Sequence, residues 1–151
     1  MTIHETLKQE LPDAMKARDE VRLRTIRALL TSFTNELVVR KEKPDGILPD
    51  EAALAVLKRS ANQRKDSIEQ FEKGGRPDLA RHEREELAVI ETYLPELMSK
   101  EQILEVAKRK KTELGAESKE KTGILVGAVM KELKGQADGK DVKEVAESLF
   151  E

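Results

Sequence analysis

The chain has 151 residues, of which 38% are apolar and 38% are charged, with 28 Lys and Arg against 30 Asp and Glu. The net charge of −2 excludes a protein that coats nucleic acid nonspecifically, since such domains are strongly basic, although it allows a local basic patch. The absence of cysteine excludes disulfides and thiolate metal sites, and the 3% of aromatic residues favours a core of aliphatic side chains packed between helices.

The N-terminal segment has no uninterrupted apolar stretch, because His4, Glu5 and Lys8 break it up. No apolar run elsewhere approaches the roughly 20 residues that are needed to span a bilayer. We therefore expect a soluble, cytoplasmic protein without membrane attachment.

Apolar residues at helical spacing predict a first helix over residues 3–17 and a second that ends near Lys41. Pro12 lies inside the first helix. Because proline lacks a backbone N–H and crowds the preceding turn, we expect this helix to kink or restart near Leu11. Asp19 stands immediately before the second helix and is placed to cap it.

A third helix is predicted to open at Pro49 and to stop at Gly74, and a fourth runs from Pro77 to Pro95. Arg64 and Lys65 occupy a gap in the apolar stripe of the third helix. The inner face of that helix is therefore not apolar throughout.

Three more helices are predicted after Pro95, each from a capping residue. Ser99 begins a capping box whose third helical position is Gln102, Ser118 is placed to cap the sixth helix, and Asp138 the seventh. No segment alternates with period two over a useful length. The sequence thus predicts an all-α, multihelical protein, with a four-helix N-terminal subdomain (1–96) followed by a three-helix C-terminal subdomain (97–151).

The chain offers little for catalysis. His4 and His82 lie far apart among polar neighbours and are predicted to be solvated surface residues. No phosphate-binding loop, dinucleotide fingerprint or metal-ligand spacing is present, so we expect no cofactor, no metal and no catalytic residues. The basic run 108–111 would splay around all sides of a helix and does not form one patch.

Gly123 and Gly127 lie four residues apart within the sixth predicted helix, on one face. A glycine inside a helix costs about 0.5–1 kcal/mol relative to alanine, so two of them call for an explanation. Two interpretations remain open: tight packing between helices, or close approach of another backbone, protein or nucleic acid.

The segment that follows is short and basic. Lys131, Lys134 and Lys140 surround small residues, and Asp138 marks the start of a helix beside Gly135. Unpaired N–H groups at a helix start, small residues and nearby lysines together form a reasonable corner for a phosphate group.

These segments also carry a resemblance. Residues 126–131 read Val-Gly-Ala-Val-Met-Lys and residues 133–139 read Leu-Lys-Gly-Gln-Ala-Asp-Gly. Together with Arg-Lys-Asp-Ser-Ile-Glu-Gln-Phe at 64–71 and the stretches 75–80 and 90–95, they resemble the GatB/YqeY family in order and spacing. The resemblance covers nearly the whole chain, which looks like a free-standing YqeY-like protein.

That family is similar to the tail domain of the GatB component of the tRNA-dependent amidotransferase, where a separate domain performs the chemistry and the tail holds the tRNA body. The resemblance implies a tRNA-binding module with amidotransferase or tRNA synthetase components as possible partners. The resemblance also implies that the RNA-facing motif of this chain consists of Gly127, Lys131, Lys134, Gly135, Asp138 and Lys140. The family label of a carbon–nitrogen ligase is not carried over, because nothing in the sequence indicates binding of ATP or activation of glutamine.

Two points qualify the implied function. Gln136 stands where relatives often have lysine, which removes one expected phosphate contact. The alternative function is a helical protein–protein adaptor, whose partner would pack on the face of Gly123 and Gly127.

Overall fold

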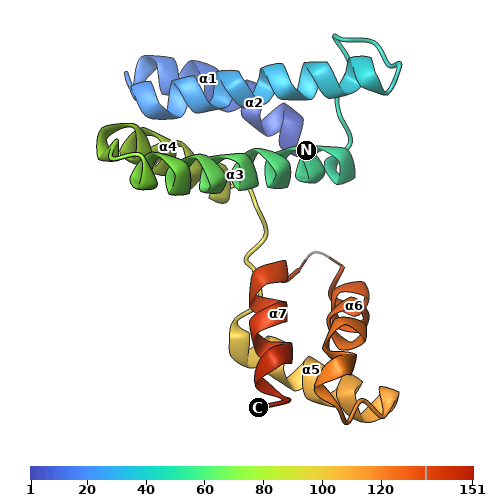
Figure 1. The fold of residues 1–151 in the computed structure, drawn as a ribbon. Coiled ribbons are helices and arrows are strands. Elements are labelled where there is room, and N and C mark those ends of the chain that lie inside the picture. Colours follow the sequence, from blue (N-terminus) through green and yellow to red (C-terminus); the bar gives the residue numbers. More distant parts are fainter. Residues whose placement is uncertain (135) are drawn as a thin grey trace. The chain divides into compact units, whose positions relative to one another are not determined.

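The computed structural model describes residues 1–134 and 136–151. Over these residues the chain forms seven α-helices, one 3₁₀ turn and no strand, which confirms the predicted all-α class. The helices divide into two units, Met1–Leu94 and Pro95–Glu151, each with a hydrophobic core of its own (Figure 1). No helix in the described part of the chain is both long and apolar enough for a membrane span.

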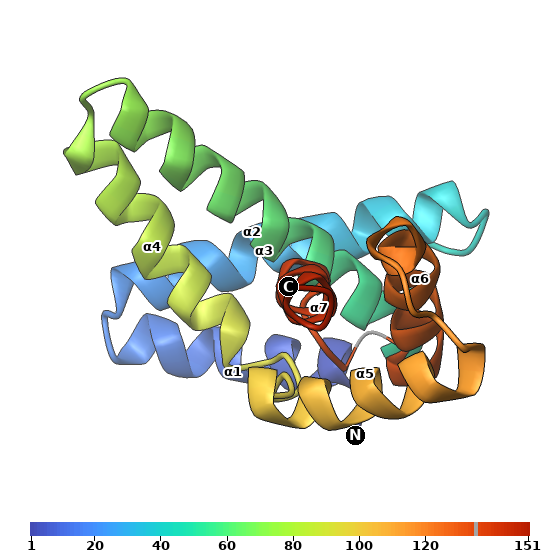
Figure 2. The same cartoon turned by 60° about the horizontal axis from the view of Figure 1, so that its bottom comes forward.

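The first unit contains four helices, with α3 and α4 running side by side as a hairpin (Figure 2). Their bounds are α1 (Ile3–Lys16), α2 (Glu20–Val39), α3 (Asp50–Lys73) and α4 (Pro77–Glu91). The predicted cap of α2 is confirmed, since the Asp19 carboxylate accepts the N–H of Arg22 at 3.1 Å. A capping box that the sequence analysis did not identify opens α1, where Thr2 and Glu5 bond each other's backbone N–H groups.

Helix α1 runs unbroken through Pro12, so the restart expected near Leu11 is wrong. Proline at this position leaves the carbonyl of Lys8 without its helical partner. Lys8 is an exposed residue, and the helix continues to Lys16 despite the lost bond.

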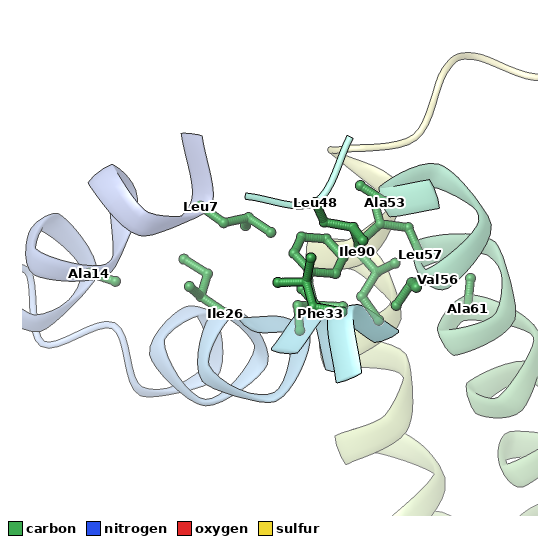
Figure 3. Packing of buried hydrophobic residues seen from close by; sticks show 12 residues of the cluster. Leu7, Ala14, Ile26, Phe33, Leu48, Ala53, Val56, Leu57, Ala61 and Ile90 are labelled. Atoms are coloured by element: carbon green, nitrogen blue, oxygen red, sulfur yellow. The ribbon is translucent and has the colours of Figure 1, made fainter. Parts of the chain in front are cut away.

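The core of the first unit is built around Phe33, which is completely buried. Figure 3 shows its ring among Leu48, Leu57 and Ile90, which come from three different segments. An aromatic ring removes a large apolar area from water, so this one side chain joins α2, α3, α4 and the segment before α3.

The second unit contains α5 (Lys100–Leu114), a 3₁₀ turn (Lys119–Lys121), α6 (Thr122–Leu133) and α7 (Gly139–Ser148). Each of the three helices packs against the other two, and Figure 2 shows α7 almost end-on with α5 crossing it. Leu125 and Val129 of α6 are fully buried between them. The predicted capping box at Ser99 and Gln102 is confirmed, with both bonds formed.

The start of the sixth helix was predicted too early. Ser118 precedes the 3₁₀ turn, its side chain forms no capping bond, and α6 begins at Thr122. The turn is closed by the N–H of Lys121, which donates to the carbonyl of Ser118 at 2.9 Å, and by the Thr122 hydroxyl, which donates to the carbonyl of Lys119 at 2.6 Å.

Candidate functional site

The outward face of α6 carries the two glycines singled out by the sequence. Gly123, Gly127 and Lys131 follow one another at spacing four, so they form one row on the helix surface, and all three are exposed. A Cβ atom built at either glycine meets no described atom within 4 Å. Close approach of a backbone to this row would therefore come from outside the packing of α5, α6 and α7. Ile124, beside the row, is 61% exposed.

The C-terminal end of α6 and the N-terminal end of α7 lie at the same end of the unit (Figure 1). Lys134 ends α6 in the left-handed conformation, with φ of 44°. At the other side of the turn, a Cβ atom on Gly139 would lie 3.8 Å from the Met130 side chain, which places the start of α7 against the last turn of α6. Gly135, a predicted site residue between them, lies outside the described residues.

Three predicted lysines, Lys131, Lys134 and Lys140, are exposed and form no ion pair with any residue that the structure describes. Lys140 nonetheless acts on its surroundings. The pKa of Glu144 is held below its usual range, chiefly by the hydrogen bond from Lys100 and also by the charge of Lys140. Lys131 and Lys134 thus present positive charge without an ion pair among the described residues, whereas the charge of Lys140 is partly offset by Glu144.

The basic run on α5 behaves differently, and it is not a free cationic surface. Arg109 contacts Glu132 at 2.6 Å, and Lys110 contacts Glu113 at 3.3 Å. Arg109 is the main reason that the pKa of Glu132 lies below its usual value. Lys111 donates to the carbonyl of Leu149 at 3.0 Å and lies over a C-terminal aromatic ring, a contact that the sequence analysis missed.

Asp138 is the cap of α7, as predicted, and its carboxylate accepts the N–H of Lys140 at 2.8 Å. A phosphate group at this helix start would compete with that carboxylate for the same donor. The lysine side chains, rather than the first N–H groups of α7, are therefore the suitable contacts for a phosphate.

The segment before α5 forms a hydrogen bond with the segment before α7. The N–H of Met98, just before α5, donates to the carbonyl of Gln136 at 2.8 Å. Ala137 is buried in the core of the unit. Gln136 itself is exposed, so a lysine at that position would also face solvent.

The prediction that His4 is a surface residue is wrong. His4 is 2% exposed, its Nδ1 accepts the N–H of Leu48 at 2.9 Å, and its ring lies edge-on to Phe33. Burial lowers the pKa of His4, with a smaller contribution from Lys8. Sequence neighbours did not reveal this role because the partner lies 44 residues away. His82 is exposed, as predicted.

A cluster of three polar side chains, which the sequence did not reveal, joins three helical segments of the first unit. Arg22 of α2 contacts Glu10 of α1 at 2.8 Å, and the hydroxyl of Tyr93, just after α4, donates to the same carboxylate. Burial and the Glu10 carboxylate raise the pKa of Tyr93. Each polar group has a partner, so the cluster fixes the end of α4 and is a structural feature.

Within the described residues, no group of three or more His, Asp and Glu side chains is arranged to hold a metal ion. The first unit does contain Arg64, which fills the gap noted in the apolar stripe of α3. Its guanidinium contacts Glu86 at 3.0 Å and donates to the hydroxyl of Ser60 at 3.1 Å.

Comparison with known proteins identifies relatives of the chain. A sequence profile of the family described as Yqey-like protein matches residues 4–150. The protein named Altered inheritance of mitochondria protein 41, mitochondrial, from Vanderwaltozyma polyspora is 37% identical over 91 residues, which cover 60% of this chain and 48% of that protein. Its namesake from Lachancea thermotolerans is 41% identical over 92 residues, covering 60% and 47%. The chain spans about half the length of these two relatives.

A further namesake, from Pyrenophora tritici-repentis, is 30% identical over 133 residues, covering 87% of this chain and 71% of that protein. These relatives contradict the expectation of a cytoplasmic protein, because all of them carry the word mitochondrial in their names.

Proposed function

The chain belongs to the Yqey-like protein family, and from that premise we propose that its C-terminal unit is a binding module for tRNA. The observation that supports this proposal is the open row of Gly123, Gly127 and Lys131 on α6, next to Lys134 and Lys140. None of the three lysines forms an ion pair within 4.0 Å with a described residue. A surface without side chains admits the sugar–phosphate backbone closely, and the lysines supply charge for phosphates.

Lysines that contact phosphates fix the position of a nucleic acid but do not read its bases. On a protein of net charge −2, binding depends on where positive charge is focused. The module is therefore expected to bind the body of tRNAs with little sequence preference, with modest affinity and with strong dependence on salt.

In this proposal the module has no catalytic site of its own and resembles the tail of the amidotransferase GatB component in function. Its macromolecular partners are tRNA and components of an amidotransferase or a tRNA synthetase. The four-helix part (1–96) and the three-helix part (97–151) act as separate modules, with the RNA contacts confined to the second.

The test is filter binding of tRNA to the full chain at several salt concentrations. Lys131→Ala, Lys134→Ala and Lys140→Ala should each lower affinity for all tRNAs alike and reduce the salt slope by roughly one unit or less. Gln136→Lys should tighten binding. Lys16→Ala is the matched control, since Lys16 is an exposed lysine of the first unit and should bind as the wild type does.

The proposal fails if the wild type binds no tRNA at low salt, or if the α6–α7 variants bind as tightly as Lys16→Ala. One specific observation favours a second function, a protein–protein adaptor. Ile124, beside the row, exposes most of its apolar side chain. Ile124→Ser should leave phosphate contacts intact, so a loss of protein binding with unchanged tRNA binding would identify the adaptor.

A further inference from the structure

A second polar surface, on the first unit, has no part in the proposed function. The N-terminal half of α2 borders a hollow of about 370 Å³ that is lined by Glu20, Leu23, Arg24 and Arg27. The four residues recur at intervals of three and four, so they share one face of the helix. All four lining residues come from α2, so the hollow is open to solvent rather than enclosed.

Two guanidinium groups at this hollow have donors to spare. Arg24 uses its Nε for Glu86 at 2.7 Å, and its two terminal nitrogens bond no described residue. Arg27, one turn further along, is exposed and forms no ion pair with the described part of the chain. Two arginines on one face thus present planar N–H donors to solvent that no described side chain accepts.

The ion pair behind the hollow does not neutralise it. Glu86 is shared between Arg24 and Arg64, so one negative charge serves two positive ones. Arg64 and Glu86 are each only 16% exposed, and Nε of Arg64 is buried without a hydrogen-bond partner. Charges in such a poorly hydrated place are screened less than those at the surface. With Glu20 counted, the hollow and this ion pair hold three arginines and two carboxylates, an excess of one positive charge.

We propose that this hollow binds a small anion, the phosphate or carboxylate group of a low-molecular-weight ligand, between Arg24 and Arg27. The guanidinium fork matches the two oxygens of either group and forms the strong, charge-assisted class of hydrogen bond. The Leu23 side chain provides an apolar wall for the rest of the ligand.

Glu20 limits the affinity and distinguishes this proposal from a purely structural one. It lines the hollow and repels an anion there, and it lies four residues before Arg24, at the spacing for a helical ion pair. If the hollow serves only a local ion pair, removing the Glu20 charge brings no new binding. If it binds an anion, Glu20→Gln tightens the binding.

The experiment is calorimetric titration of the full chain with pyrophosphate and, separately, with citrate at constant ionic strength. We expect one saturable site for at least one probe, and the probe that binds identifies phosphate or carboxylate as the ligand group. Arg27→Gln should weaken binding about tenfold, as for the loss of one charge-assisted contact, and Arg27→Lys should be intermediate. Arg27 makes no contact that its removal would break, so folding is retained.

Two controls make the result specific. Arg81→Gln removes an exposed arginine that is paired with Glu85 at 3.3 Å and should leave binding unchanged. Lys131→Ala should also leave anion binding unchanged, and Arg27→Gln should leave tRNA filter binding unchanged. The anion site and the tRNA surface are therefore tested independently of each other. Absence of saturation with both probes, or equal binding by Arg27→Gln and Arg81→Gln, overturns the proposal.

Discussion

The imidazole Nδ1 of His4 accepts the backbone N–H of Leu48 at 2.9 Å, which joins the first turn of α1 to the segment that enters α3. A second bond strengthens the connection, because the N–H of Ile3 donates to the Asp50 carboxylate at 2.8 Å. Only neutral His4 can accept the bond from Leu48, so protonation breaks it.

The first prediction is that acid destabilises the first unit through His4. Burial lowers its pKa in the folded state, so the unfolded chain takes up a proton more readily. The stability that neutral His4 contributes is present above the unfolded pKa of about 6.5 and is lost as the pH falls below it. Urea unfolding followed by Tyr93 fluorescence, at several values of pH on both sides of that point, measures the loss.

His4→Gln should show a flatter dependence of unfolding free energy on pH across this window. His82→Gln, which removes the exposed histidine, should keep the wild-type slope. Equal slopes for the two variants would contradict the role of His4.

The second prediction concerns the centre of the first core. Phe33→Ala should lower the unfolding free energy of that unit by about 3–5 kcal/mol, because the cavity adds to the lost transfer energy. Tyr93 is the single tyrosine in the chain, so its fluorescence reports on this unit. Val39→Ala is the control, since Val39 is 74% exposed and its loss should change stability by less than about 0.5 kcal/mol.

The third prediction concerns Gly127. Because a Cβ atom at this position meets no described atom, Gly127→Ala should stabilise α6 by about 1 kcal/mol. If a nucleic-acid backbone approaches the row closely, the same methyl group should weaken tRNA binding. Thermal unfolding and filter binding of one sample measure both effects.

Gly115→Ala gives the contrast. Gly115 ends α5 with φ of 62°, where a side chain is strained, so alanine there should destabilise the unit. A Gly127→Ala variant that is both more stable and fully active in tRNA binding would show that no close approach occurs.

The fourth prediction compares two serines. Ser99→Ala should cost roughly 1 kcal/mol, because it removes the side-chain acceptor for the N–H of Gln102. Ser118→Ala should be nearly neutral, because that hydroxyl caps nothing. Urea unfolding of the two variants, followed by circular dichroism, measures the difference. An equal loss of unfolding free energy in both would contradict this prediction.

The fifth prediction is that fragments 1–96 and 97–151 fold separately. Each contains its own buried core, with Phe33 central to one and Leu125 to the other. Both fragments should retain helical circular dichroism and unfold cooperatively. Aggregation of fragment 1–96 would indicate a core shared between the parts.

Local signals in the sequence were sufficient for the number of α-helices among the described residues and for several of their starts, although α4 ends at Glu91 and not at Pro95 as predicted. The caps at Asp19, Ser99 and Asp138 depend on a side chain and an N–H two or three residues away, so the sequence contains both partners at a readable spacing. The prediction that Ser118 caps the sixth helix was wrong because the same signal precedes a 3₁₀ turn as readily as an α-helix.

Contacts between distant segments were beyond such reasoning. His4 has polar neighbours along the chain, and its burial depends on Phe33 and Leu48. The pairing of Arg109 with Glu132 likewise depends on how α5 and α6 pack, which no local pattern specifies. For the predicted site, the sequence identified which residues to examine, whereas their exposure and lack of ionic partners required the fold.

The bond from the N–H of Met98 to the carbonyl of Gln136 makes the Met98 amide a natural spectroscopic probe of the turn that joins α6 to α7. A molecule that polarises or displaces the Gln136 carbonyl changes the electron density at that amide and the rate at which its hydrogen exchanges with solvent. One backbone resonance, from a residue 38 positions earlier in the chain, will thus register occupancy of the turn without any label placed there.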